Sequence, residues 1–168
     1  MKMVKETERL FIRVLEAEDV KPLKRIWGDE EVMELCAGAT AHEKLPKIVE
    51  YYVKCHDEKG LSVYAVVEKA SGIVIGTAGF NVENTIEKVE LIYHFAKQSW
   101  GKGLAYEAVS ACVEVAKSNN VVKCLYASAD PTNLSSLRIL EKLGFKYIGM
   151  KWFDDTNQEE PYYELDVR

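Results

Sequence analysis

The spacing of hydrophobic residues alternates along the chain between the two-residue period of strands and the longer period of helices. Segments rich in β-branched and aromatic residues predict strands, at about residues 8–14, 62–68, 73–82, 88–95, 121–128, 145–153 and 161–167. Apolar residues three and four positions apart predict helices, at about residues 19–27, at 42–58, after Gly103, and between Pro131 and Gly144. This order mixes hairpins with helical crossovers, so we expect a mixed α/β sheet with helices on its faces, not a doubly wound parallel sheet.

Two of these segments have especially clear patterns. The helix expected after Gly103 has an apolar stripe made of Ala105, Ala108, Val109, Cys112, Val113 and Ala116. In the strand at 88–95, one face of the strand carries Val89, Leu91, Tyr93 and Phe95. The opposite face carries Glu90, Ile92 and His94, so a carboxylate stands in a strand that is otherwise apolar around it.

Length and charge narrow the class of protein. The 168 residues contain no internal repeat and no linker rich in proline or glycine, so we expect a single domain over residues 1–168. The net charge of −5 argues against a nucleic-acid-binding protein, which usually has a basic face. It is compatible with a cationic substrate such as an amine, although net charge does not decide the substrate.

Cysteines and histidines give no sign of a metal site. Their spacing matches no metal-binding motif, and they lie at Cys36, Cys55, Cys112 and Cys124 and at His42, His56 and His94. No apolar run approaches the length of a membrane span, and the N-terminus lacks the apolar core of a signal peptide. We therefore expect a cytoplasmic protein with reduced thiols and no metal, nucleic-acid or membrane partner.

The segment from Gln98 to Ala105 lies between a predicted strand and a predicted helix and contains glycines at 101 and 103. Glycine lets the backbone approach a bulky anion, and free N–H groups at the helix start favour negative charge. A diphosphate is the natural occupant of such a turn, and Lys102 adds a charge. The alternative is an ordinary strand-to-helix turn. The segment matches neither the phosphate loop of nucleotide hydrolases nor the dinucleotide fingerprint.

Two motifs lie at a characteristic distance from each other: Gln98-x-x-Gly101-x-Gly103 before a helix, and Asn133-x-x-Ser136 followed by Leu140-Glu141-Lys142-Leu143-Gly144-Phe145. Together they resemble the signatures of the GCN5-related N-acetyltransferase (GNAT) superfamily. Glu90-Leu91-Ile92-Tyr93 and Glu8-Arg9-Leu10-Phe11-Ile12-Arg13 are similar to the RimJ/RimL branch, whose members acetylate the N-terminal amine of ribosomal proteins, with relatives that act on other amines. The resemblance covers about residues 8–167.

The resemblance implies a twisted mixed sheet in which two central parallel strands diverge, here the strands that end near Phe95 and Ser128. It implies that acetyl-CoA enters between them as co-substrate, without a metal, and that its pantetheine pairs with backbone groups near Phe95 and Ala96. The implied cofactor-binding residues are Phe95, Ala96, Gln98, Gly101, Lys102, Gly103, Leu104, Ala105 and Asn133.

Acetyl transfer to an amine requires the neutral form of the amine. Deprotonating a lysine-like amine at pH 7 costs about 4.6 kcal/mol, whereas an α-amine near pKa 8 costs only about 1.4 kcal/mol. Glu90 is the candidate general base, directly or through a water, because burial raises the pKa of a carboxylate toward neutrality. The alternative is a solvent-facing glutamate or a salt-bridge partner.

A second catalytic group is needed at the departing thiolate. Many members of the superfamily use a tyrosine that here corresponds to Leu140, whereas RimL-like members use a serine that corresponds to Ser136. We therefore expect Ser136 to hydrogen-bond or protonate the sulfur. The alternative is that Asn133 caps the helix and Ser136 is only a helix-start residue. A backbone N–H near Phe95 is the candidate oxyanion donor.

Other residues are assigned to packing or to the acceptor. Tyr93 and His94 are candidate substrate-binding residues, Tyr93 more as packing than as catalyst, and Trp100 is expected to pack under the glycine turn. We expect the choice of acceptor to depend on the segments 28–58, 81–87 and 154–160. The acidic residues of the last segment either steer a cation or form a solvated hairpin tip.

These residues predict an N-acetyltransferase that moves an acetyl group from acetyl-CoA to a primary amine by direct attack on the thioester. The acceptor is a protein N-terminus or a small-molecule amine, and a homodimer remains open. One alternative is a catalytically idle CoA-binding or protein-interaction module on the same fold. Another is an unrelated α/β ligand-binding protein whose glycine turn holds no phosphate.

Overall fold

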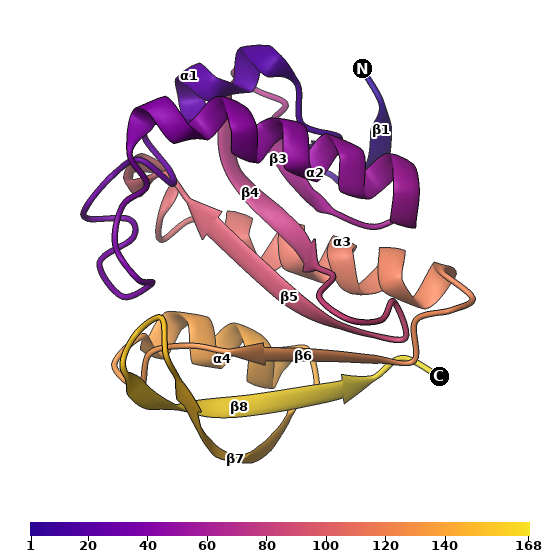
Figure 1. The fold of residues 1–168 in the computed structure, drawn as a ribbon. Helices are drawn as coiled ribbons and strands as arrows, with labels where there is room; N and C mark the ends of the chain where they lie inside the picture. Colours follow the sequence, from indigo (N-terminus) through magenta and orange to yellow (C-terminus); the bar gives the residue numbers. More distant parts are fainter.

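The computed structural model describes residues 1–168, and all its strands join in one mixed sheet (Figure 1). The strands are β1 (Met3–Glu6), β2 (Leu10–Arg13), β3 (Val63–Glu68), β4 (Val74–Asn81), β5 (Lys88–Phe95), β6 (Cys124–Ser128), β7 (Lys146–Phe153) and β8 (Gln158–Asp166). Their order in the sheet is β1-β2-β3-β4-β5-β6-β8-β7. Neighbours are antiparallel except β5 and β6, which are parallel, so the mixed sheet predicted from the sequence is confirmed.

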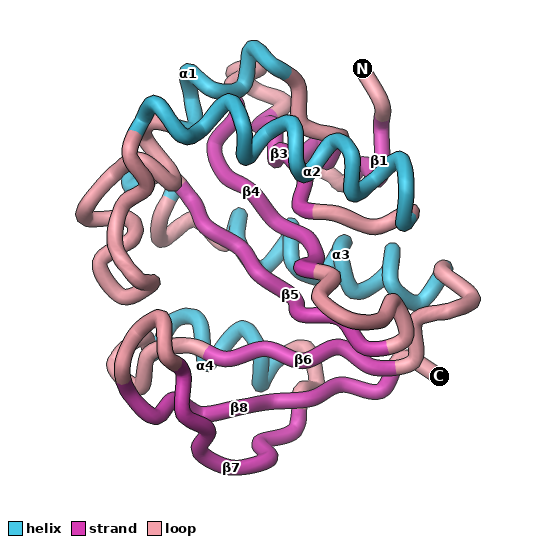
Figure 2. Tube along the Cα trace, in the orientation of Figure 1, coloured by secondary structure: helices cyan, strands magenta, loops and turns pink.

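Helices cover both faces of this sheet (Figure 2). They are α1 (Val20–Leu23), α2 (Leu45–Lys59), α3 (Leu104–Ser118) and α4 (Leu134–Lys142), with short 3₁₀ turns at Ala17–Asp19, His42–Lys44 and Lys97–Ser99. The helices α1 and α2 pack on one face and share a smaller core with it, whereas α3 and α4 contribute to a larger core on the other face. None of them is both long enough and apolar enough to cross a membrane.

The strand β3 shows why the central strands are apolar throughout. Tyr64 and Val66 belong to the larger core, while Val63, Ala65 and Val67 belong to the smaller one. Successive side chains of a strand point to opposite faces, so a strand that is covered on both faces carries a continuous apolar run.

The two central strands diverge toward their C-terminal ends. The parallel pairing of β5 with β6 is limited to three residue pairs, at Lys88, Val89 and Glu90 of β5. From Leu91 to Phe95, β5 pairs only with β4, and the separation of β5 from β6 is visible in Figure 1. The expected divergence between strands ending at Phe95 and Ser128 is therefore confirmed.

The structure differs from the sequence prediction mainly at element ends. The strand β1 is short and largely exposed, so its residues carry no clear apolar period. The helix expected at 19–27 is α-helical only at Val20–Leu23, after which N–H groups bond to carbonyls three residues back. The strand expected from Val121 begins at Cys124, because the Asn119 side chain accepts the N–H groups of Val121 and Val122.

Candidate active site

A cleft of about 720 Å³ opens where β5 and β6 diverge. Its wall includes β5 from Glu90 to its C-terminal end, the start of α4, the segment 31–36 between α1 and α2, and part of the β7–β8 hairpin. The three segments that the sequence analysis assigned to acceptor choice each contribute to it, through residues 31–36, through Asn81, and through Asp155, Thr156 and Glu160. The predicted candidates that line it are Glu90, Tyr93, His94, Phe95, Ala105, Asn133 and Ser136.

The glycine turn leads from β5 into α3. Gly101 and Gly103 have φ angles of 75° and 76°, in the left-handed region that glycine adopts without a steric penalty. Gly103 is the N-cap of α3 and supplies no side-chain cap, so the N–H groups of the first turn have no partner within the helix. A Cβ at Gly101 would meet no atom within 4 Å. The turn is therefore open and rich in N–H donors.

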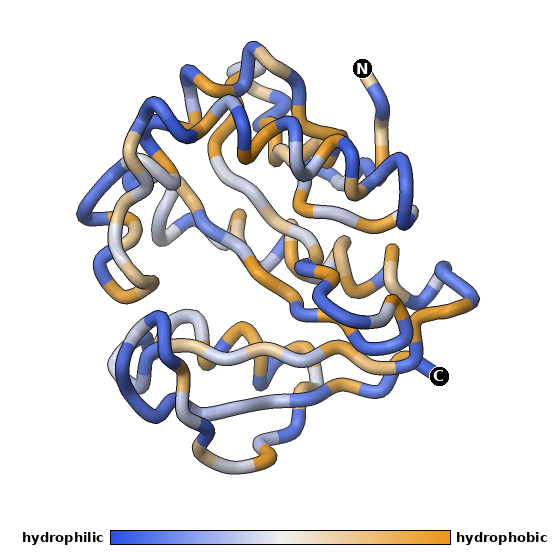
Figure 3. The backbone as a smooth tube through the Cα atoms, in the orientation of Figure 1, coloured by the Kyte–Doolittle hydropathy of each residue, from blue (hydrophilic) through white to orange (hydrophobic).

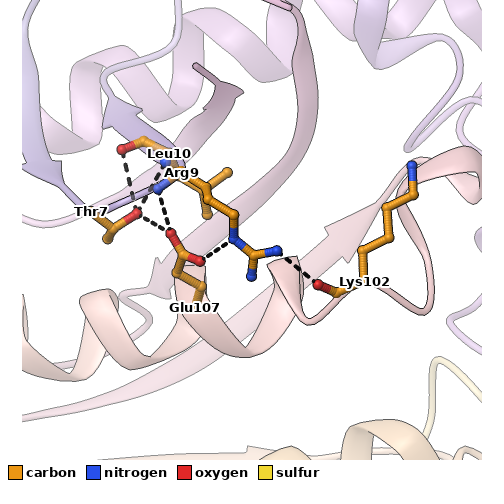
Figure 4. Close-up of polar contacts among 5 residues, drawn as sticks. All are labelled: Thr7, Arg9, Leu10, Lys102 and Glu107. Carbon is orange, nitrogen blue, oxygen red and sulfur yellow. Dashed lines mark hydrogen bonds and ion pairs between the residues drawn. The ribbon is translucent and has the colours of Figure 1, made fainter. Parts of the chain in front are cut away.

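An ion-pair network holds this turn against the N-terminal hairpin (Figure 4). The guanidinium of Arg9 donates to Glu107 Oε1 at 2.7 Å and to the carbonyl oxygen of Lys102 at 2.9 Å. Glu107 also accepts the Thr7 hydroxyl at 2.6 Å and the Arg9 backbone N–H at 2.9 Å. Arg9 thus links the β1–β2 connection to the turn and to the first turn of α3.

The other predicted cofactor residues lie around this turn in different settings. Leu104 is buried in the larger core, which leaves only its backbone N–H for a ligand. Gln98 and Lys102 are exposed. The carbonyl of Lys102 is taken by Arg9, whereas Ala105 faces the cleft.

The backbone at the end of β5 has fewer free groups than expected. The Ala96 N–H donates to the Ile75 carbonyl at 2.8 Å, and the Ala96 carbonyl accepts the Ser99 N–H at 2.9 Å. The Ala96 N–H is therefore not available to pantetheine. In an antiparallel ladder successive residues point their N–H groups to opposite sides, so the Phe95 N–H faces away from β4, toward the divergence.

Trp100 corrects a second expectation. Its side chain is 48% exposed and lines the cleft instead of packing under the glycine turn. Its indole Nε1–H donates to the Phe95 carbonyl at 2.8 Å. The ring is therefore held at the cleft wall by a polar contact.

Glu90 lies in the central strand β5, directly opposite Asn81 of β4. Asn81 Nδ2 donates to Glu90 Oε1 at 3.2 Å, and Tyr52 donates its hydroxyl to Asn81 Oδ1 at 3.2 Å. Glu90 has no ion-pair partner. Burial raises the pKa of its carboxyl, the Asn81 hydrogen bond opposes this rise, and a further rise comes from the charges of Glu83, Asp155 and Glu160. Glu90 is thus half-buried and hydrogen-bonded to a neutral amide, without a salt-bridge partner.

Ser136 and Tyr93 meet inside the cleft. Their hydroxyl oxygens lie 2.6 Å apart, with either one able to donate, and the Tyr93 hydroxyl also donates to the Ser136 carbonyl at 3.2 Å. Burial raises the pKa of Tyr93 to about 12, so the phenol stays protonated at neutral pH. Asn133 Oδ1 accepts the Ser136 N–H at 3.3 Å and caps α4, while Leu140 is buried in the core. The hydroxyl of Tyr93 is a polar group of the site that the strand pattern did not indicate.

His94 lies on the face of β5 that looks toward α1 and α2 and lines the cleft. Its Nδ1 is buried without a hydrogen-bond partner, and burial lowers the pKa of the imidazole to about 4, so it is neutral at pH 7. Its neighbour across the sheet is Thr77, whose Oγ1 is also buried without a partner.

Comparison with known protein families identifies the family of the chain. Residues 9–146 match the family model described as "Acetyltransferase (GNAT) domain". Among curated proteins, the chain is similar to the "Uncharacterized N-acetyltransferase p20" of Bacillus licheniformis, with 28% identity over 148 residues that cover 86% of this chain and 83% of the relative.

Solved structures share the fold. An acetyltransferase of the GNAT family from Bacillus anthracis matches with a TM-score of 0.83 and 24% identity over 99% of both chains. The microcin C7 self-immunity acetyltransferase MccE, solved in complex with acetyl-CoA and AMP, matches with a TM-score of 0.80 and 12% identity, covering 95% of this chain and 93% of MccE. At these identities the likeness shows the fold alone.

Proposed function

The chain belongs to the GNAT acetyltransferase family, and on this premise we propose that it moves an acetyl group from acetyl-CoA to a primary amine. The observation that carries the proposal is the cleft between β5 and β6, which contains a half-buried carboxylate, Glu90, and a pair of hydroxyls, Ser136 and Tyr93. The α3 N-terminus with its open glycine turn lies beside it in the fold. Together these groups supply the base, the proton donor and the anion site that the reaction needs.

The glycine turn suits the pyrophosphate of the cofactor. Backbone N–H groups of Gly101, Gly103, Leu104 and Ala105 would hold the phosphates at the positive end of the α3 dipole, and the open space above Gly101 leaves room for them. Gln98 and Lys102 would contact the same group from the surface, and Asn133 would contact the pantetheine. When bound, acetyl-CoA supplies an activated acyl group as a thioester.

Glu90 acts as the proton acceptor for the incoming amine. It has no cationic partner, and Asn81 holds one of its oxygens, so the other oxygen is available to an ammonium group or to a bridging water. The raised pKa of Glu90 brings the carboxyl closer to the pKa of the amine, which eases proton transfer. This role matters most for lysine-like amines, whose deprotonation costs the most.

Ser136 and Tyr93 act at the departing sulfur. When Tyr93 donates its proton to Ser136 Oγ, the serine hydroxyl is free to donate to a thiolate, so the two hydroxyls work as a chain. The Phe95 N–H, which faces the divergence, is the donor for the oxyanion. The pair replaces the tyrosine that Leu140 cannot provide, which argues against a catalytically idle module.

We further propose that the chain forms one catalytic domain of the RimJ/RimL-like branch and acts in the cytoplasm. Its acceptor is an N-terminal α-amine of the ribosomal-protein type or a small-molecule amine, with His94 lining the acceptor end of the cleft.

Thiol release from acetyl-CoA tests the proposal, measured against N-terminal peptides, amino acids, aminoglycosides and polyamines, with acetyl-CoA binding followed separately by calorimetry. Release of CoA with one class of amine supports the transferase. Binding of acetyl-CoA without release for any amine would favour the idle module, and failure to bind any CoA ester would favour an unrelated ligand-binding protein.

A further inference from the structure

The cleft is lined by acidic residues and by no lysine or arginine. The carboxylates on its wall come from four separate parts of the chain and are Glu31, Glu34, Glu90, Asp130, Asp155 and Glu160. Only Glu31 has an ion-pair partner, Lys97 at the rim. Some carboxylates elsewhere in the chain are paired, for example Glu107 with Arg9 and Glu164 with Lys88. The cleft therefore gathers five carboxylates that have no ion-pair partner in one place.

Glu160 is the most informative member of this set. Its residue is only 5% exposed, and its Oε2 accepts hydrogen bonds from Gln158 Nε2 at 2.9 Å and from the Thr156 hydroxyl at 3.0 Å. The same Gln158 amide donates to Asp130 Oδ2 at 2.8 Å. One neutral amide thus lies between two carboxylates. A buried carboxylate without a cation is costly, and neutral donors offset only part of that cost.

The negative charges of these carboxylates all affect the interior of the cleft. Burial and then the charges of Glu160, Asp130 and Asp155 raise the pKa of the Cys36 thiol, which lies on the other wall of the cleft, in the segment between α1 and α2. The β7–β8 turn is coloured hydrophilic in Figure 3 and lies on the same side of the molecule as that segment. The negative potential therefore extends across the cleft from wall to wall.

A second, independent feature marks the same cleft as a ligand site. His94 lines the cleft. Its Nδ1, and Oγ1 of Thr77 opposite it on β4, are buried polar atoms without a hydrogen-bond partner, and such atoms are rare unless a ligand or water satisfies them. A divalent metal ion is a poor explanation, because no three His, Cys, Asp or Glu side chains in the structure are grouped closely enough to hold one. The cleft instead suits an organic molecule that carries two or more separated positive charges.

We propose that the acceptor is a small aliphatic amine with at least two positive charges, a diamine or polyamine, whose reacting amine faces Glu90. A distal ammonium lies against Asp130, Asp155 and Glu160. This inference rests on the proposed transferase activity. In the reaction the amine nitrogen forms a bond to the acetyl carbon as the carbon–sulfur bond breaks. The ammonium loses two protons: one ends on the CoA thiol and the other is released. The product has one positive charge fewer, so the acidic cleft holds it less strongly.

The test compares kcat/KM for 1,4-diaminobutane with that for butylamine, which has the same carbon chain and one charge. Close charge pairs can strengthen association by about tenfold or more, and we expect a preference of about 10-fold or more for the diamine. The preference should fall as salt is added. Equal values for both amines, or a higher value for N-terminal peptides, would overturn the inference while leaving the transferase intact.

Glu160→Gln and Glu159→Gln make a matched pair of variants, because both remove one charge from the same strand and Glu159 is exposed and does not line the cleft. We expect Glu160→Gln to reduce the diamine preference about 10-fold and Glu159→Gln to leave it unchanged. An equal effect of the two would contradict the inference. If the Glu160→Gln variant does not fold, the comparison of kcat/KM for 1,4-diaminobutane and butylamine in the unaltered protein still tests the inference. Absence of thiol release with every amine would contradict the proposed function itself.

Discussion

At the residue scale, the site depends on polar side chains that have neutral hydrogen-bond partners and no ion-pair partner. Glu90 has an amide and no cation beside it, and the hydroxyl of Tyr93 in β5 lies 2.6 Å from the hydroxyl of Ser136 in α4. Such groups are costly to bury, so they cluster where chemistry needs a shifted pKa or a positioned proton. Activity and stability should therefore respond in opposite directions to changes at Glu90.

We expect Glu90→Gln to lower kcat by about 100-fold for a lysine-like amine, the lower end of the effect of a general base, and far less for an α-amine. The folded-state pKa of Glu90 is raised by burial, so ionisation of this carboxyl costs stability as the pH rises through that pKa. The variant, which cannot ionise, should unfold at a higher temperature at pH 7 than the unaltered protein. Its Tm advantage should vanish at a pH below the ordinary glutamate pKa. An equal loss of kcat for both amine types would remove Glu90 as the base.

The hydroxyl pair makes a different prediction. Ser136→Ala and Tyr93→Phe should each lower kcat about 10-fold, with little change in acetyl-CoA affinity, because both act on the same proton at the sulfur. The double variant should lose no more than the worse single one, since groups that act as a unit are not additive. Tyr147→Phe, at an exposed tyrosine of β7, serves as the control. Additive losses would show that the two hydroxyls act separately.

At the element scale, the strand–turn–helix unit from β5 to α3 positions the anion site. The turn needs two left-handed residues, which glycine supplies, and Arg9 fixes the carbonyl of Lys102 from a distant hairpin. The helix start is thus shaped by local backbone conformation and held in place by a long-range ion pair.

Gly101→Ala tests this unit. A left-handed alanine costs about 1–2 kcal/mol, and relief of that strain would redirect the N–H groups, so we expect the Kd for acetyl-CoA to rise about 10-fold in calorimetry. Gly60→Ala is the matched control. Gly60 has a similar φ of 79°, likewise has no atom within 4 Å of a Cβ, and ends α2. It should lose similar stability without a change in Kd. If both variants bind acetyl-CoA normally, the turn is not part of the cofactor site.

At the scale of the whole molecule, the two halves of the sheet are joined by only three residue pairs between β5 and β6. The larger core crosses this junction, because Val89 of β5 and Leu125 of β6 both belong to it and are fully buried. The cleft can therefore open between the strands without separating the halves.

Leu125→Ala should destabilise the protein by about 2–5 kcal/mol, the usual cost of truncating a buried leucine. The two halves should still unfold together, since they share one core. Circular dichroism and tryptophan fluorescence should give the same midpoint in urea. Fluorescence reports on Trp27 and Trp100 in one half and on Trp152 in the other. Separate transitions would show that the three residue pairs leave the halves independent.

The sequence by itself determined the features that depend on neighbouring residues. The apolar periods predicted the order of strands and helices from 8 onward, the glycines predicted the turn before α3, and Asn133 predicted the start of α4. These features follow from local dihedral preferences and from alternation of buried positions, so they can be read from the chain directly.

Only the tertiary structure decided which side chains meet. Arg9 and Glu107 are 98 positions apart, Tyr93 and Ser136 are 43 apart, and Gln158 and Asp130 are 28 apart. Such contacts depend on strand register, on the angle at which β5 and β6 diverge, and on helix packing, which no local period encodes. For the same reason, the sequence placed acidic residues in several segments, whereas the fold brought them into one cleft.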